Sequence, residues 1–293
     1  MLYLAWMDEL FCSAIMAAMQ LGKISSDELK LLLDFYPQLA GVELAEARRL
    51  MLENQDIIFA EDVTKAVWCH LYELPAKEHF VRAMVGLGGE GVLREIAQCP
   101  NQIHALPGAT AKALAEIEAW EPTKEEADAV RKYLPTIFGL AMSLTNSVRS
   151  LMVFGCYLND LIAQVRAGGE SGNKALLSAV KIDPTVLGCP SVITRMSRSV
   201  MLDDQKFLAQ VRKAMTSKFT KREQKNYQCM RIVLQVLYET GAPKLNEADL
   251  YALFVEELKL VSGERVTDEG NVANALRQFV YQFMKDKPVS QSP

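Results

Sequence analysis

The sequence predicts an all-α protein, a multi-helix bundle built around a long central helix with a second, smaller helical unit at the C-terminus. Helix-breaking residues are few, with 16 Gly and 11 Pro in 293 residues. Good helix formers such as Ala, Leu, Met, Glu and Lys are abundant. The stretch from Tyr133 to Arg166 carries only one charged side chain, Arg149, between Pro135 and Tyr157. We therefore place the central helix at about 136–166.

At 293 residues the chain has the length at which proteins usually form two domains, each with its own hydrophobic core. The segment AGGESGN, residues 167–173, has the composition of a flexible linker. We expect an acidic N-terminal bundle over 1–166, this linker, a basic-then-acidic C-terminal unit over 174–286 and a disordered tail over 287–293.

The N-terminal elements follow from hydrophobic periodicity and from capping signals. The first predicted helix is apolar on most of its circumference, so it should pack into a core or against a partner. Ser25 with Glu28 and Thr123 with Glu126 match the capping box, in which each side chain bonds the other residue's amide. The predicted helices span residues 2–21, 25–33, 42–54, 60–74, 76–85, 92–97, 110–120 and 123–134.

The central helix has two distinct faces on a wheel of 100° per residue. Gly139, Ser143 and Ser147 form a row of small residues that lets a neighbouring helix approach closely. Arg149 and Asp160 share a narrow polar face, but they lie too far apart along one helix to pair. Most of this helix should therefore be buried.

This polar face has two interpretations, because an unpaired buried charge is costly. Its charged groups either pair with neighbouring helices or line a ligand pocket. The candidate pocket residues are Arg149, Asp160, Asn146 and Gln164.

After the linker we expect a short helix to about residue 180 and then an irregular segment framed by Pro184 and Pro190. Helices at about 203–216, 221–240, 246–260 and 268–286 complete the chain. The last three have lengths and turns that resemble a helix-turn-helix bundle.

Charge is unevenly distributed along the chain. Residues 1–173 hold 14 Lys and Arg against 23 Asp and Glu, residues 174–231 hold 12 against 4, and residues 232–293 hold 6 against 9. The basic middle segment attracts an anionic partner, such as a nucleic acid, or faces the acidic N-terminal part of its own chain, and composition does not choose between these. The candidate nucleic-acid contacts are Lys206, Arg212, Lys213, Lys218, Lys221, Arg222, Lys225, Arg231, Asn274 and Gln278.

For each catalytic or cofactor motif in the sequence, a purely structural interpretation is better supported than the functional one. The G-x-G-x-x-G match at 86–91 lacks a strand–helix–strand setting and is interpreted as a helix-breaking turn. His70, His79 and His104 lack metal-ligand spacing, and Asp203-Asp204 lacks a third aspartate and is interpreted as a helix start. We therefore predict no cofactor and no metal.

The six cysteines are spread singly, which is typical of reduced thiols in a cytoplasmic protein. The central stretch is long enough to span a bilayer, but its polar middle favours a buried core helix, so no membrane span is expected. The leading hypothesis is a non-enzymatic cytoplasmic binding or regulatory protein with a protein partner or self-association, and possible nucleic-acid contact. The alternatives are an all-α enzyme or ligand-binding protein, and an oligomeric helical scaffold.

Overall fold

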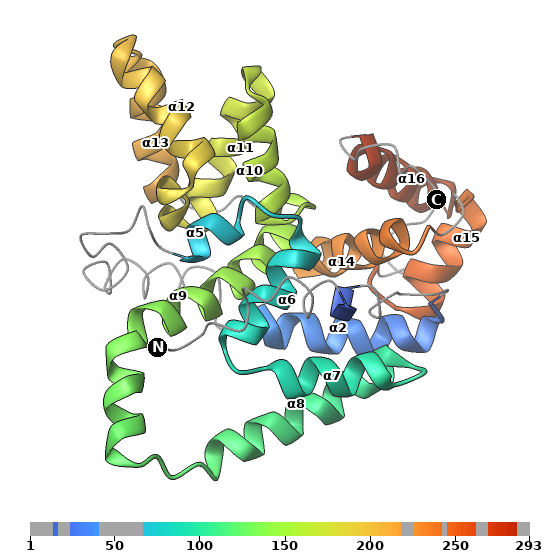
Figure 1. Cartoon of the computed structure of the whole chain (residues 1–293). Helices are drawn as coiled ribbons and strands as arrows, with labels where there is room; N and C mark the ends of the chain where they lie inside the picture. Colours follow the sequence, from blue (N-terminus) through green and yellow to red (C-terminus); the bar gives the residue numbers. More distant parts are fainter. Residues whose placement is uncertain are drawn as a thin grey trace. The chain divides into compact units, whose positions relative to one another are not determined.

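The computed structural model describes residues 14–16, 24–40, 67–217, 225–241, 245–261 and 269–285. These residues form helices and connecting turns and contain no strand, which confirms the all-α fold class (Figure 1). The elements are α2 (Ser26–Ala40), α5 (Val67–Leu71), α6 (Ala76–Gly86), α7 (Glu90–Gln98), α8 (Gln102–Glu118), α9 (Lys124–Phe154), α10 (Leu158–Ala167), α11 (Gly169–Ile182), the 3₁₀ helix η3 (Pro184–Gly188), α12 (Pro190–Met201), α13 (Gln205–Thr216), α14 (Lys225–Glu239), α15 (Glu247–Tyr251), the π-helix η5 (Ala252–Glu257) and α16 (Glu269–Lys285).

The chain forms two compact units. In its described part, the first unit contains α5 to α8, most of α9, and α10 to α13. The second contains most of α2, α14 to α16, and residues 151–155, which comprise the last turn of α9 and Gly155. The predicted boundary at 167–173 differs from this division, because residues 156–219 belong to the first unit together with α5 to α9.

The predicted central helix at 136–166 is interrupted, and this corrects the sequence-based expectation. α9 runs from Lys124 to Phe154 with Pro135 inside it, and α10 starts afresh at Leu158. Gly155 ends α9 with φ +78°, a left-handed conformation that glycine adopts without steric cost. Asp160 then accepts a hydrogen bond from the Tyr157 amide at 3.1 Å and starts the new helix.

The glycine-rich segment predicted as a linker is almost entirely helical. Only Gly168, with φ +81°, lies between α10 and α11. Gly172 faces α10 so closely that a Cβ there would lie 2.8 Å from the Gln164 carbonyl oxygen. The glycines therefore make a tight hairpin between two packed helices rather than a flexible connection.

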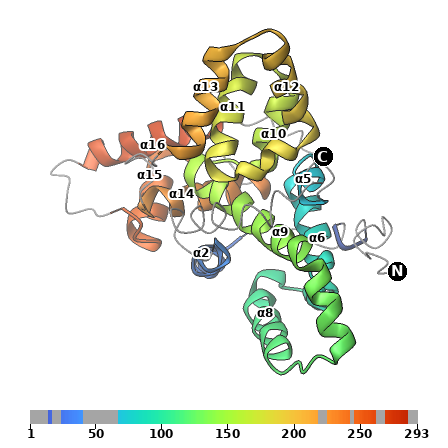
Figure 2. The same cartoon turned by 90° about the vertical axis from the view of Figure 1, so that its left-hand side faces the viewer.

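The segment predicted as irregular around Pro184 and Pro190 holds two helices. Each proline occupies the first turn of its helix, where its missing N–H is not needed. The sequence-based prediction does not include α12, because Pro190 is interpreted there as a helix breaker and not as the first residue of a helix. In space, α10 packs on α11, α11 on α13 and α12 on α13, so two helical hairpins lie together in the first unit (Figures 1 and 2).

Both predicted capping boxes are present. The Ser25 amide donates to Glu28 at 2.7 Å and the Thr123 amide to Glu126 at 2.8 Å. The predicted turn at 86–91 also occurs, with Gly88 at φ +84° between α6 and α7. The predicted helices at 2–21, 60–74 and 221–240 are described only at 14–16, 67–74 and 225–240, where 14–16, 67–71 and 225–239 are helical. The predicted helix at 42–54 and tail at 287–293 lie outside the described residues.

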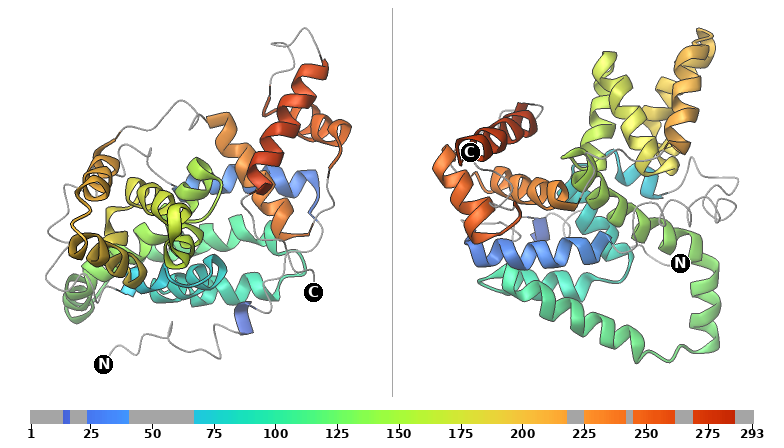
Figure 3. Two further views of the ribbon diagram at one scale, coloured as in Figure 1. Left: turned by 90° about the horizontal axis from the view of Figure 1, so that it is seen from above. Right: turned by 180° about the vertical axis from the view of Figure 1, so that it is seen from behind.

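The second unit has its own small core. Leu250, Phe254, Val272 and Leu276 of α15, η5 and α16 are buried, and the predicted helix at 246–260 is present as α15 followed by one π-helical turn (Figure 3). Within this unit, the Ser26 hydroxyl of α2 bonds the carboxylate of Glu257.

Candidate nucleic-acid interface and the buried polar network

Arg149 lies in the core of the first unit, where its side chain takes part in a buried polar chain. Its Nη1 donates to the Asn146 Oδ1 at 2.7 Å, and the Asn146 Nδ2 donates to Asp183 at 3.0 Å. All three residues are at most 4% exposed. The amide of Asn146 therefore connects a buried cation on α9 to a buried anion at the end of α11.

Asp183 lies at the centre of these hydrogen-bonded side chains. One carboxylate oxygen accepts from the Tyr72 hydroxyl at 2.6 Å, and the other accepts from the Thr185 amide at 2.8 Å and hydroxyl at 2.7 Å. Burial, reinforced by the Asp183 charge, holds the pKa of Tyr72 well above its ordinary value. The phenol therefore stays protonated and keeps its hydrogen bond, which fixes η3 against α5.

A second buried network joins α6, α9 and α10. The Asn159 Nδ2 donates to the Leu74 carbonyl at 2.9 Å, so its Oδ1 is the acceptor for the Ser147 hydroxyl at 2.9 Å. His79 lies 3.2 Å from that Oδ1 through Nδ1, and 2.9 Å from the Ser143 hydroxyl through Nε2. Nδ1 must therefore carry the proton of the neutral ring, and Nε2 is an acceptor that shares the single Ser143 hydroxyl proton with the Leu140 carbonyl oxygen, 2.7 Å from that hydroxyl. Burial lowers the pKa of His79 to about 4.

The residues predicted to line one pocket have separate roles. Asp160 caps the start of α10, whereas Arg149 belongs to α9 and contacts Asn146. Gln164 lies on α10, where its backbone carbonyl accepts from the Gly168 amide at 3.1 Å. The wheel that placed Arg149 and Asp160 on one helix face fails, because the helix ends at Phe154.

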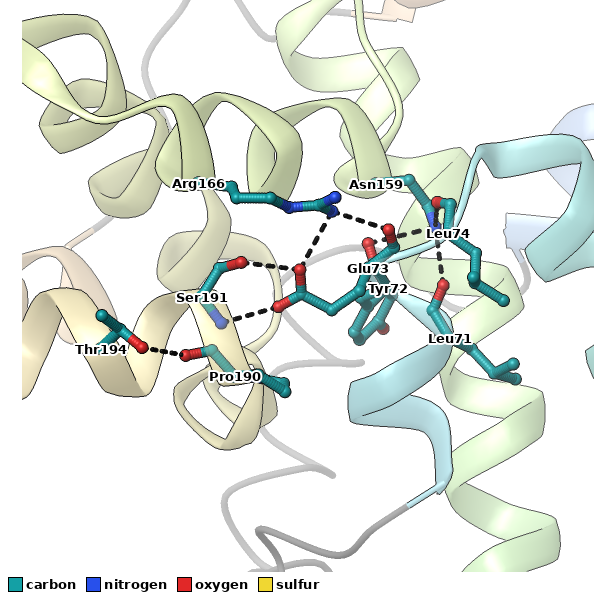
Figure 4. A network of polar contacts seen from close by, with 9 residues as sticks. All are labelled: Leu71, Tyr72, Glu73, Leu74, Asn159, Arg166, Pro190, Ser191 and Thr194. Atoms are coloured by element: carbon teal, nitrogen blue, oxygen red, sulfur yellow. Dashed lines mark hydrogen bonds and ion pairs between the residues drawn. The ribbon is translucent and has the colours of Figure 1, made fainter.

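Glu73 forms a further polar contact that sequence patterns did not indicate. Its carboxylate accepts from the Ser191 amide at 2.8 Å and hydroxyl at 2.7 Å, and pairs with Arg166 at 3.0 Å (Figure 4). Arg166 also donates to the Glu73 carbonyl oxygen at 2.7 Å. This carboxylate thus links the α5–α6 loop to α10 and to the start of α12.

The exposed face of α13 carries charges of one sign. Lys206, Arg212 and Lys213 are exposed and lie near no carboxylate within ion-pair distance among the residues that the structure describes. The helix itself, QKFLAQVRKAMT, contains no Asp or Glu. Its remaining exposed side chains are Gln205, Ala209, Gln210 and Thr216.

The other face of α13 anchors it to the bundle. Phe207 and Val211 are 5% and 2% exposed. The Arg195 guanidinium of α12 lies 4.2 Å from the Phe207 ring centre, and its Nε donates to Asn173 of α11 at 2.7 Å. Asp204 accepts from the Phe207 amide at 3.1 Å and caps the helix. The orientation of the cationic face is therefore fixed by packing.

The end of α12 and the turn that follows it expose three consecutive apolar residues, Val200, Met201 and Leu202. Sequence patterns do not indicate this feature, because the expected irregular segment offers no helix end at residue 201. The only signal in the sequence is the apolar triplet just before Asp203-Asp204.

None of the remaining predicted nucleic-acid contacts that the structure describes belongs to α13. Lys218, Lys221 and Arg222, and the side chain of Lys225, lie outside the described residues. Arg231 of α14 donates to the Met152 carbonyl oxygen at 2.7 Å and is half-buried. Asn274 and Gln278 are exposed on α16, in the second unit.

Two further observations concern classes of site. Within the described ranges, no three His, Cys, Asp or Glu residues are grouped so that they could hold a metal ion. By length and composition, one described helical stretch, Val130–Phe154, is long and apolar enough to cross a membrane, and 56% of its most apolar window is buried in the protein. Its polar residues Asn146 and Arg149 are buried in contact with each other.

Comparisons with protein-family models, with curated proteins and with solved structures gave no match for this chain. The candidate interface therefore rests on the chemistry of its own residues.

Proposed function

We propose that this protein is a non-enzymatic nucleic-acid-binding or regulatory protein that contacts the phosphate backbone through the exposed face of α13. The observation that carries the proposal is the composition of that face, with three cations, two glutamines and no carboxylate. Surface cations of folded proteins are usually interspersed with acids, so a helix face of one sign favours an anionic partner.

The geometry of α13 suits a regularly charged partner. On a helical wheel Lys206, Gln210 and Lys213 fall within about 60° of one another, and the two lysines are about 10.5 Å apart along the axis. Lysine and arginine bind phosphates by charge, and glutamine donates to phosphates or base edges. Three phosphate contacts would release their counterions, which makes binding depend strongly on salt.

The test is a titration of fluorescent duplex DNA, single-stranded DNA and RNA followed by anisotropy between 50 and 200 mM salt. Three phosphate contacts predict a slope of log K against log salt of about −2.7 or steeper for a duplex, a loss of about 40-fold over that range. Replacing Lys206, Arg212 and Lys213 together by Gln should flatten the slope by about 2.7.

The matched control replaces Lys124, Arg131 and Lys132 by Gln. These two lysines and one arginine are also exposed, but they lie on α9 among carboxylates such as Asp128, which is 3.6 Å from Arg131. The control should bind like the wild type. An absence of binding at 50 mM salt, or an equal loss in both triple variants, would remove the proposal.

We also propose a reducing, cytoplasmic location, which is supported by the free thiols of the five described cysteines. The alternative of an enzyme or ligand-binding pocket on the polar face of the central helix has less support. Arg149 is held by Asn146, and Asp160 caps a different helix.

A further inference from the structure

We infer that the turn between α12 and α13 is an apolar wedge that inserts between the base pairs of a duplex held by α13. This inference rests on the proposed function and makes it more specific, because it names the kind of nucleic acid and the deformation that the protein imposes. The wedge consists of Val200, Met201 and Leu202.

The side chains of the wedge are largely exposed to solvent. Val200, Met201 and Leu202 are 63%, 84% and 68% exposed. Consecutive helix residues point about 100° apart, so the three side chains together cover more than half of the circumference. Single exposed apolar residues are ordinary, but three in succession form an apolar knob. The hairpin of α12 and α13 that carries them is shown in Figure 2.

The turn that carries the wedge is well ordered by its hydrogen bonds. The Asp204 amide donates to the Ser199 carbonyl at 2.8 Å and the Asp203 amide to the Val200 carbonyl at 3.1 Å, which is the pattern of a Schellman motif. Asp203 adopts φ +51° and completes this motif. A wedge must keep its place while it separates base pairs. Because these hydrogen bonds already order the turn, the protein loses little conformational entropy at this turn when it binds.

The side chains favour a duplex over a single strand. Proteins that hold single strands stack bases on aromatic rings, and neither the exposed face of α13 nor the turn contains an aromatic residue. Met and Leu belong to the residue types that enter base steps and bend a duplex by about 20 to 90°. Lys206 is the second residue of α13 and follows Leu202 by four positions across the turn, so phosphates held by α13 bring the base steps close to the knob.

The charges of the turn do not themselves attract the duplex. Asp203 is exposed and opposes phosphate, while Asp204 lies 4.0 Å from the Arg195 guanidinium. The turn therefore acts through its apolar side chains, and the cations of α13 supply the electrostatic attraction. An anionic membrane surface would also suit cations beside an apolar knob, so the experiment includes vesicles.

The experiment measures bending of a 24-base-pair DNA duplex with central TA steps, which are the most easily unstacked. Donor and acceptor dyes sit at the two ends, and transfer efficiency is recorded at saturating full-length protein in 50 mM salt. The test variant is Met201→Ala/Leu202→Ala, which removes exposed side chains and should not affect folding. The control is Ile117→Ala, since Ile117 is 65% exposed on α8.

The wild type and Ile117→Ala should raise the transfer efficiency by the same amount. The rise caused by Met201→Ala/Leu202→Ala should be at least threefold smaller. The Kd of this double variant for the duplex should differ from that of the wild type by less than threefold. Equal bending by the wild type and the double variant, or binding without bending, overturns the wedge and leaves the proposed function intact. Failure to bind the duplex overturns both. If vesicles containing phosphatidylserine retain the wild type but not the double variant, and bending is unchanged, the knob is a lipid contact and the inference is overturned.

Discussion

Protonation of His79 should destabilise the first unit as the pH falls from 7 towards 4. The imidazole is 1% exposed, lies against the Tyr72 ring with centroids 5.2 Å apart, and is held by Asn159 and Ser143. Its pKa is about 4 in the folded protein against 6.5 for an ordinary histidine. The unfolded chain therefore binds more protons between pH 6.5 and 4, so stability falls as the pH falls through this window.

The size of the effect follows from the shift in pKa. A shift of one unit corresponds to about 1.36 kcal/mol, so the difference between 6.5 and about 4 corresponds to about 3.4 kcal/mol, which is fully lost below pH 4. About 2 kcal/mol of this is lost by pH 5. Above pH 6.5 the contribution is fully present, because the ring is neutral in both states.

The assay is urea unfolding at pH 7 and pH 5, followed by the fluorescence of Trp68, which is 5% exposed in the same core. Replacing Trp6 and Trp120 by Phe leaves Trp68 as the reporter. In this background His79→Gln should reduce the pH-dependent loss of unfolding free energy by about 2 kcal/mol. The control, His70→Gln, changes an exposed side chain and should leave that loss as it is in the parent protein. An equal loss in His79→Gln and its parent would refute the reasoning.

The remaining predictions concern close packing and the buried amide. Gly139→Ala places a Cβ against the Trp68 ring and Gly172→Ala places one 2.8 Å from a backbone carbonyl, so each should lower the unfolding free energy by about 1–3 kcal/mol. In the matched variant Gly91→Ala, at the second residue of α7, the added Cβ would meet no atom within 4 Å, so the unfolding free energy should rise by up to about 1 kcal/mol; a loss there would contradict the packing argument. Asn146→Leu removes two buried hydrogen bonds to charged groups, one to the Arg149 guanidinium and one to the Asp183 carboxylate, and should cost about 3–5 kcal/mol in urea unfolding; a cost below about 1 kcal/mol would show that water replaces the amide.

The small-residue row on α9 shows how far the sequence could predict the site. The spacing of Gly139, Ser143 and Ser147 predicted a buried face with close neighbours, and all three are buried. Their partners come from three elements: Trp68 of α5, His79 of α6 and Asn159 of α10. Periodicity gives the direction in which a side chain points along a helix, but the element that covers it depends on contacts between distant segments.

The polar residues of the same helix behaved differently. Arg149 and Asn146 were expected to pair with neighbouring helices or to line a pocket, and their carboxylate partner, Asp183, lies 37 positions from Asn146 in the chain. Nothing in the local pattern around residue 183 distinguishes this aspartate from a surface residue before a proline. Its importance arises because η3 folds back against α5 and α9, which is a property of the tertiary structure.

The sequence by itself determined the all-α class, the two capping boxes, the turn at 86–91 and the cationic composition of α13, because each depends on residues within a few positions of one another. Only the tertiary structure decided that the central helix breaks at Gly155, that α11 begins inside the glycine-rich segment and that Met201 remains exposed. Local propensity is a weak preference at a glycine or a proline, and the packing of distant helices outweighs it.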